Sequence, residues 1–461
     1  MSGSFLGINV ASNALRSFQR ALDTTGHNIA NANTRGYSRQ RVEYQTNVPL
    51  YFYSKGYHGL GQGMHITGIT RIRDGYLDTS YNNSNGQFNR NDTLAQGLGR
   101  IEQVYGEPND SGISAGIERF FNSWSGLGSA PNSDAARLEV QSSGQNLADQ
   151  VRRKFQQLDG LESRNNQEIN ATVAQVNNLS QRIADLNQEI LRAQSSGGTS
   201  ADLMDQRDAA VEELSTLTDV SKRIQPDGSY SVFVGGFTVV EGSTSRDIPN
   251  TIDPATGGFT FGTANFQIKT GRLSGLLALS TSLTEQKANL DALANTLRTE
   301  INNLHRTGVD ALGTTGNNFF NDVVAPPQTG AIDFDLASPV KNDARYIAAG
   351  LTGDPGDGGL AMSIGQIRDS AFAALGSQTF GDYFAREMEK VSQKTNYFQN
   401  ASITEDAIRS QVESQRQAVS GVSVDDEMAD LLRFQRSYQA AAKTLTIFDQ
   451  VTEDLLGMVR R

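Results

Sequence analysis

The sequence contains no cysteine, and its 461 residues include only four histidines and one tryptophan. Without cysteine, disulfide bonds, thiolate metal sites and a cysteine nucleophile are excluded. No two histidines are three or four residues apart, which excludes a zinc-binding histidine pair on a helix. No Gly-Lys dipeptide occurs either, so a phosphate-binding P-loop is excluded. We therefore expect neither a metal ion nor a cofactor.

Long apolar runs are also absent, and no stretch approaches the roughly 18 apolar residues of a membrane span. The opening segment, 1–20, has polar residues at every second or third position, which is not the pattern of a secretory signal peptide. Acidic residues outnumber Lys and Arg by 51 to 40, and the formal charge of −11 would repel a nucleic-acid backbone. We expect no membrane insertion, no nucleic-acid partner and, if the protein is secreted, no cleaved signal peptide.

Catalytic motifs are scarce. Gly112–Gly116 fits the GxSxG pattern of serine hydrolases, but no strand is predicted ahead of it, and that motif requires a strand, a turn and a helix. A pair of carboxylates for sugar hydrolysis is always possible among 51 acidic residues, yet nothing singles out one pair. We therefore predict that the protein is not an enzyme.

Both ends of the chain carry a narrow apolar seam with the seven-residue spacing of a coiled coil. One such helix alone more often lies on a globular body, but here both ends share the pattern and differ in charge. Residues 1–45 carry five Arg against two acids, net +3, and residues 420–461 carry five bases against seven acids, net −2. We predict that the ends pair and form an assembly interface consisting of Ile8, Leu15, Phe18, Leu22, Ile29, Val424, Leu431, Phe434, Tyr438, Leu445, Phe448 and Leu455.

The middle of the chain alternates between helical and strand-like patterns. Apolar heptads predict a long helix from Ser133 to about Arg192 and a returning helix over Ala201–Leu217. The period changes to two near 230–239, which predicts strands, and a helix is expected again over 271–306. Further predictions are a loop at 54–63, a short helix at 93–105, irregular structure at 308–360, and a last helix that begins at Val424 after the capping residue Ser423.

This order predicts a mainly α fold with an inserted β-containing lobe, arranged in nested layers. The terminal helices pair as a coiled coil, a helical bundle forms the middle domain, and a small β-rich domain lies outermost. The predicted domains are a terminal coiled-coil assembly domain (1–45 and 420–461), a helical middle domain (46–200, 272–310 and 362–419) and an outer β-containing domain (201–271 and 311–361).

Two terminal motifs resemble those of a known family. Residues Asn28–Gln40 (NIANANTRGYSRQ) resemble the signature that bacterial flagellar rod, hook and hook-associated proteins carry after their N-terminal helix, and the YSRQ part is similar to the hook-associated protein 1 family. Residues Ser420–Glu427 (SGVSVDDE) resemble that family's C-terminal motif, and Leu203–Asp208 (LMDQRD) and Gly271–Gly308 are also similar to it. The signature residues are Asn28, Ala30, Asn31, Thr34, Gly36, Tyr37, Ser38 and Arg39.

The resemblance implies a structural subunit of the extracellular bacterial flagellum at the junction between hook and filament. It further implies export through the flagellar type III apparatus, without a cleaved signal peptide. The implied partners are further copies of the chain in a ring, the hook subunit, the second junction protein (hook-associated protein 3) and an export chaperone. That chaperone would hold the C-terminal helix through Phe434, Tyr438, Leu445 and Phe448.

Three alternatives remain open from the sequence. The first is another flagellar axial protein, such as the hook subunit or the second junction protein. The others are a cell-wall hydrolase of flagellar assembly and a secreted coiled-coil adhesin or effector.

Overall fold

The computed structural model describes residues 2–53, 57–106, 112–196, 198, 200–249, 252–253, 258–261, 264–322, 330–354 and 356–459. The described chain is mainly helical, with long terminal helices packed together and small antiparallel sheets inserted, which confirms the predicted fold class. It divides into two compact units. Unit 1 consists of Met1–Gly86, Gln175–Ile248 and Glu405–Arg461, and unit 2 consists of Gln87–Ala174 and Pro249–Thr404. The three predicted domains and their boundaries stay a prediction.

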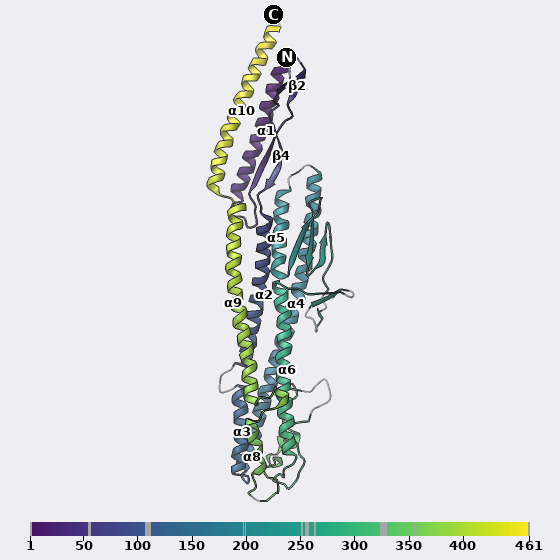
Figure 1. The fold of residues 1–461 in the computed structure, drawn as a ribbon, viewed down its shortest axis with the longest axis vertical. Coiled ribbons are helices and arrows are strands. Elements are labelled where there is room, and N and C mark those ends of the chain that lie inside the picture. Colours follow the sequence, from purple (N-terminus) through teal and green to yellow (C-terminus); the bar gives the residue numbers. More distant parts are fainter. Residues whose placement is uncertain are drawn as a thin grey trace. The chain divides into compact units, whose positions relative to one another are not determined.

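Figure 1 shows the helices and strands in chain order. The helices are α1 (Ser2–Ala30), α2 (Gly75–Tyr105), α3 (Ile113–Ser129), α4 (Asp134–Ser195), α5 (Ala201–Leu217), α6 (Gly271–His305), α7 (Ser338–Asn342), α8 (Gly359–Gln366), α9 (Phe380–Ser420) and α10 (Val424–Val459).

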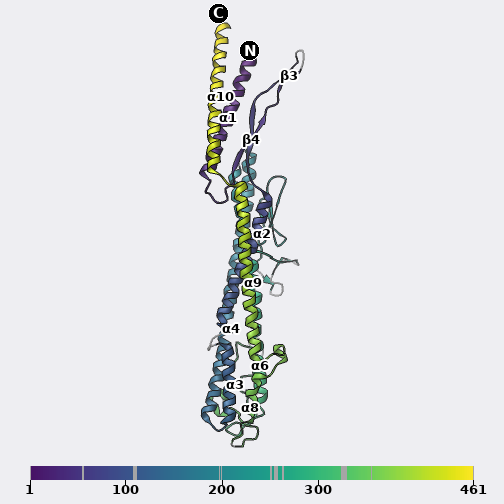
Figure 2. The same ribbon diagram turned by 60° about the vertical axis from the view of Figure 1, so that its left-hand side comes forward.

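Within unit 1, α1 and α10 lie side by side, and both chain termini are at the same end of the pair (Figures 1 and 2). The two helices are antiparallel, because Gly7 near the start of α1 lies against Phe448, whereas Asn28 near its end is hydrogen-bonded to Glu427. A methyl group added at Gly7 would come within 2.6 Å of the Phe448 ring. The absence of a side chain at Gly7 therefore permits the close approach of the helices at this level.

Two antiparallel strand pairs follow α1. β1 (Gln40–Thr46) pairs with β4 (Met64–Arg71), and β2 (Leu50–Tyr53) pairs with β3 (Tyr57–Leu60). The predicted loop at 54–63 is therefore wrong over β3, and residues 54–56 of that prediction lie outside the described residues. β4 shows why sequence periodicity missed this region, because its residues are half-buried or exposed on both faces and lack a buried apolar alternation.

A separate core of unit 1 lies between α4, α5 and an antiparallel sheet in the order β5 (Val220–Ile224), β6 (Tyr230–Val234), β7 (Phe237–Glu241) and β8 (Thr244–Ser245). Val176, Ile183 and Ile190 of the predicted α4 seam are fully buried. The buried Asn187 ties this helix to the sheet, because its Nδ2 donates to the carbonyl oxygens of Tyr230 (2.9 Å) and Gly242 (2.6 Å).

Unit 2 is built around aromatic side chains. Phe120, Trp124, Phe319 and Phe320 are fully buried, and the ring centroids of Trp124 and Phe319 are 5.1 Å apart. The buried His305 lies against this cluster, donates from Nδ1 to the carbonyl oxygen of Asn317 (2.7 Å) and accepts at Nε2 from the amide of Ala348 (2.9 Å). Burial lowers the pKa of His305 to about 4, so the ring is neutral at pH 7. The described strands of this unit are β9 (Ile252–Asp253), β10 (Gly258–Phe261) and β11 (Ala264–Phe266).

The predicted long helix, its returning partner, the strands near 230–239 and the helix at 271–306 are confirmed by α4, α5, β6, β7 and α6. The start of the last helix at Val424 is also confirmed. The helix predicted at 93–105 is α2, which begins much earlier, at Gly75. Its first half is rich in Asn and Ser and lacks an apolar repeat, and tertiary contacts that bury Tyr81 and Asn85 explain its helical state.

Candidate assembly site

The turn after α1 carries the signature residues, and Asn28 anchors it. Both amide hydrogens of Asn28 are donated, one to the carbonyl oxygen of Gln40 (2.9 Å) and one to Oε2 of Glu427 (3.0 Å). Its Oδ1 accepts from the Gln40 amide (3.0 Å) and from the Tyr37 hydroxyl (2.7 Å). Because Asn28 is buried and all four of its hydrogen-bonding positions are used, no smaller or differently charged side chain satisfies the same partners.

Glu427 connects this turn to the C-terminal helix. Its carboxylate is almost completely buried, with 2% of the side chain exposed, and its Oε1 accepts from Nε of Arg39 at 2.6 Å. Arg39 also reaches Oδ2 of Asp430 at 3.4 Å. A buried carboxylate is costly unless it is paired and hydrogen-bonded, and here Asn28 and Arg39 together meet that need.

The same turn is bonded to the break between α9 and α10. The amide of Arg39 donates to the carbonyl oxygen of Ser420 at 2.9 Å, which satisfies one of the last carbonyls of α9. Ser423 then caps α10, because its Oγ accepts from the Asp426 amide (3.4 Å) and its carbonyl oxygen accepts from the Glu427 amide (3.0 Å). The predicted capping role of Ser423 is thereby confirmed.

On its other side the turn is held by acidic residues of α5. The Ser38 amide and hydroxyl donate to the two carboxylate oxygens of Asp205, at 3.1 and 2.8 Å. Arg71, at the end of β4, donates to Oδ1 of Asp205 at 2.7 Å and to Oδ2 of Asp208 at 2.8 Å. We call Asn28, Tyr37, Ser38, Arg39, Asp205 and Glu427 the signature network.

Asp208 lies in the most strongly charged part of this region. Burial alone would raise the pKa of Asp208, but Lys222, Arg73 and Arg71 hold it well below its usual range. The Tyr230 hydroxyl also donates to its Oδ1 at 2.8 Å. Asp208 is therefore ionised at neutral pH, and its ion pairs with Lys222, Arg73 and Arg71 form part of the structure.

Tyr37 is the aromatic residue of the network. Its hydroxyl lies 3.0 Å from Nδ1 of His27, and the two rings meet edge to face. Burial, followed by the negative charges of Asp202, Asp205 and Glu427, raises the pKa of Tyr37. Tyr37 therefore stays neutral and able to donate to Asn28.

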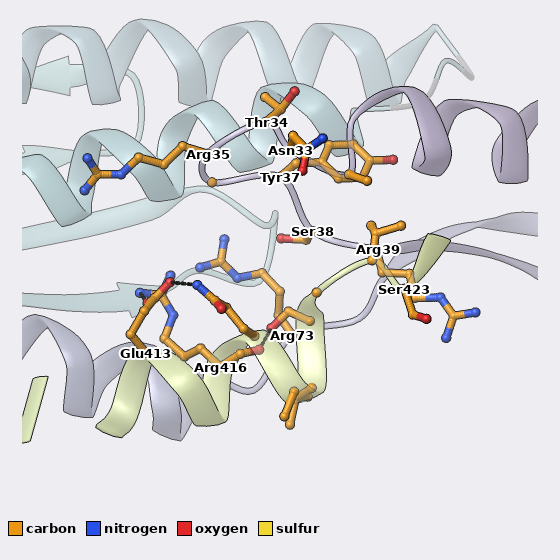
Figure 3. A pocket seen from close by; sticks show the side chains of 18 of the residues that line it. Asn33, Thr34, Arg35, Tyr37, Ser38, Arg39, Arg73, Glu413, Arg416 and Ser423 are labelled. Atoms are coloured by element: carbon orange, nitrogen blue, oxygen red, sulfur yellow. Dashed lines mark hydrogen bonds and ion pairs between the residues drawn. The ribbon is translucent and has the colours of Figure 1, made fainter. Parts of the chain in front are cut away.

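A cleft of about 870 Å³ lies between the signature turn and the end of α9. Figure 3 shows Asn33, Thr34, Arg35 and Tyr37 on one side of this cleft and the α9 residues Glu413 and Arg416 on the other. Ion pairs position the Arg416 guanidinium, with Nε 3.2 Å from Oδ1 of Asp78 and NH2 3.1 Å from Oε2 of Glu212. The cleft-lining cations Arg35, Arg73 and Arg416 are all held in ion pairs.

Nine predicted interface residues are half-buried on the α1–α10 pair, namely Ile8, Leu15, Phe18, Leu22, Ile29, Leu431, Phe434, Leu445 and Phe448. The other three predicted interface residues, Val424, Tyr438 and Leu455, are 46, 36 and 42% exposed. Because these side chains are only half-buried, part of their apolar surface remains exposed on both α1 and α10.

The signature residues differ in how deeply they are buried. Asn28 and Ser38 are buried, and Asn31, Tyr37 and Arg39 are half-buried. Ala30, Thr34 and Gly36 are exposed. Gly36 has a φ of +82°, a left-handed conformation that favours glycine and sets the direction in which the turn returns to Tyr37.

Sequence reasoning missed the acidic and basic partners of the signature, namely Asp205, Asp208, Arg71, Arg73 and Arg416. The similarity of Leu203–Asp208 to the family was the available signal, because it placed two acids on one short helix. Their role could not be read from it, since Ser38 and Asp205 are 167 positions apart.

Among the residues that the structure describes, no cluster of three or more acidic or histidine side chains could hold a metal ion. The described helices likewise include none that is long and apolar enough to cross a membrane.

Comparison with protein families gives matches along most of the chain. Residues 98–320 match the family described as the flagellar hook-associated protein FlgK helical domain. Residues 413–458 match the C-terminal family of flagellar basal body rod FlgEFG proteins, and residues 8–37 match the flagella basal body rod protein family.

Individual relatives match over nearly their full length. The flagellar hook-associated protein 1 of Bacillus subtilis is 28% identical over 99% of each chain, and that of Escherichia coli is 26% identical over 98% of this chain and 99% of the relative. The solved structure of the flagellar hook junction protein FlgK from Burkholderia pseudomallei superposes with a TM-score of 0.64 at 17% identity, over 74% of this chain and all of that chain.

Proposed function

The chain belongs to the flagellar hook-associated protein 1 (FlgK) family, and from this premise we propose that it assembles into the axial structure through its paired terminal helices. As a member of this family it is a structural component of the flagellum at the hook-filament junction, and not an enzyme. The observation that carries the proposal is the α1–α10 pair, in which nine of the predicted interface residues are only half-buried.

The geometry supports this proposal in two ways. Apolar side chains that remain half-exposed on a helix pair gain further burial only from another chain, at about 25 cal/mol per Å² of apolar surface. The signature network fixes the base of the pair, because it ties the end of α1, the start of α10 and the end of α9 to one another. The network therefore fixes the orientation in which the α1–α10 pair would meet neighbouring chains.

The specific partners are part of the proposal. They are copies of the same chain in a ring, the hook subunit, the second junction protein (hook-associated protein 3) and an export chaperone, with the assembled chain outside the cell. Export through the flagellar type III apparatus without a cleaved signal peptide belongs to the same proposal.

The proposed chaperone site on α10 has a structural consequence. Phe434, Leu445 and Phe448 are half-buried on the α10 side of the helix pair, Phe448 lies against Gly7 of α1, and Tyr438 is 36% exposed. A chaperone that holds these four side chains would displace α1 and so keep the two terminal helices apart before export. The chaperone and α1 would then compete for the same apolar side chains of α10.

A pair of matched variants tests the assembly proposal. Leu15 and Leu431, which lie outside the proposed chaperone site, are changed to Asp, and the control changes the exposed Gln435 and Gln439 of α10 to Asp, so that both variants gain the same charge. Each is expressed in a flagellated bacterium that lacks its own hook-associated protein 1. We expect the control to restore motile filaments and the interface variant to leave bare hooks.

Circular dichroism and secretion into the medium are measured alongside, and we expect the interface variant to remain helical and exported. Motile cells with the interface variant would contradict the proposal.

A further inference from the structure

The outward face of the terminal helix pair carries two sets of charges that have no partner within the described chain. On α1, Arg16 and Arg20 are exposed, one turn apart, with Asp23 on the same face. Near the end of α10, Asp449, Glu453 and Asp454 are exposed. Among the described residues, the ion pairs of α10 run from Glu427 and Asp430 to Arg39 and Arg433 and do not reach either set.

The two sets cannot pair within one copy. Gly7 lies against Phe448, so Arg16 and Arg20 are nine and thirteen residues from that level in one direction along the antiparallel pair. Glu453 and Asp454 are five and six residues from it in the other direction. At about 1.5 Å per residue, the two sets are about 25 Å apart along the helix axis, far beyond the reach of an ion pair.

Apolar side chains accompany the acidic set. Ile447, Val451 and Met458 are 54, 44 and 75% exposed, and their spacing of four and seven residues places them on one face of α10 together with Asp454. An apolar patch with a charge at its centre is typical of a protein contact in which burial gives affinity and charge gives register. The carbon chains of two arginines offer the matching apolar surface.

We propose that the C-terminal acidic face of α10 in one copy docks on the Arg16–Arg20 face of α1 in a second copy, displaced by about 25 Å along the helix axis. This docking rests on the proposed assembly function and specifies which surfaces meet. Because the two faces differ, the contact is heterologous, and each copy offers one face to each of two neighbours. Repetition of this contact builds a ring or a helical layer instead of a closed dimer.

Charge reversal with rescue tests the docking. Variant A carries R16E and R20E, variant B carries E453K and D454K, and variant AB carries all four changes. A control carries R436E and K443E, which reverse two exposed bases elsewhere on α10. Arg460 and Arg461, outside the described residues, are unchanged in all variants. Full-length chains are added to isolated hooks that lack hook-associated proteins, and bound chain is quantified at low salt.

We expect at least tenfold less bound chain for A and for B, and binding within about threefold of the unmodified chain for AB and for the control. A mixture of A and B in equal amounts should bind as well as AB, because each supplies the face that the other needs.

Binding of A and B at the unmodified level, or failure of AB to recover while the control binds, would overturn the docking and leave the assembly proposal standing. Failure of the unmodified chain to bind hooks would overturn both.

Discussion

Phe120, Trp124 and Phe319 in unit 2 are fully buried, whereas the described apolar residues of α10 in unit 1 are all at least partly exposed. In the core of unit 2, aromatic rings meet rings of the same chain, such as Phe319 and Phe320 with centroids 4.8 Å apart. On α10 the buried described side chain is the carboxylate of Glu427. The core of unit 2 is thus held together by apolar contacts, while the terminal pair is joined by polar contacts at its base and leaves its apolar side chains partly exposed.

The largest expected effect separates the two regions. Phe120→Ala removes a ring that contacts Phe121, Trp124 and Phe319, and we expect it to lower the free energy of unfolding by about 4 kcal/mol. The comparison variant Phe448→Ala, on the half-buried face of α10, should cost less than about 2 kcal/mol in the monomer. Guanidinium unfolding of both measures the difference. Equal losses would show that the terminal pair has a core like that of unit 2.

The next effect concerns the polar base of the terminal pair. Glu427→Ala leaves Arg39 and Asn28 without their shared partner, and we expect a local cost of about 3 kcal/mol at the start of α10. Asp425→Ala, an exposed acid two residues earlier, serves as the control. Hydrogen exchange of residues 421–430 reports the result, with faster exchange expected in the Glu427 variant alone. Similar exchange in both variants would exclude a special role for Glu427.

A pH effect of about 2 kcal/mol is expected from unit 2. The pKa of His305 is about 4 in the fold and near 6.5 when unfolded, so the unfolded chain binds the proton more readily between these values. The stabilisation is complete above pH 6.5 and is lost as the pH falls toward 4. Unfolding of the chain and of a His305→Gln variant is compared at pH 7.5 and pH 5. We expect the variant to be less stable at pH 7.5 and to lose less on acidification, and parallel losses would contradict this assignment.

The smallest effect lies at the contact of α1 and α10. Gly7→Ala places a methyl group within 2.6 Å of the Phe448 ring, and we expect a loss of about 1 kcal/mol that Phe448→Leu relieves. Gly26 lies on the same helix, and a methyl group added there would meet no atom of another part of the chain within 4 Å. Gly26→Ala should therefore stabilise the chain by up to about 1 kcal/mol. Thermal unfolding followed by circular dichroism measures both. A stabilising Gly7→Ala would mean that the helices are not in close contact at this level.

Sequence patterns predicted the features whose cause is local. Val176, Ile183 and Ile190 are seven residues apart in sequence, so they lie on the same face of α4, and all three are buried as predicted. The start of α10 was predictable because the capping bond joins Ser423 to Asp426, only three residues away. The strands β1 and β4 were missed because each residue pairs with one 18 to 31 positions away and because both faces of β4 are at least partly exposed.

The assembly site was predicted only in part for the same reason. The signature residues were identified by their resemblance to the family motif, but Asp205, which binds Ser38, is 167 positions away, and Glu427, one of the partners of Asn28, is 399 positions away. Polar contacts over such separations leave no periodic trace in the sequence. Gly7 likewise gives no sign of its role until Phe448 is placed against it.

The cap at Ser423 and the bond from Arg39 to Ser420 fix the position of the start of α10. With 36 residues, α10 is about 54 Å long. A tilt of about 10° at its base would carry the tip sideways by about 9 Å, roughly one helix diameter. The few hydrogen bonds at the base therefore act together with the contact of Gly7 and Phe448 to set the position of the far end of the helix, and a small change at the base is magnified there.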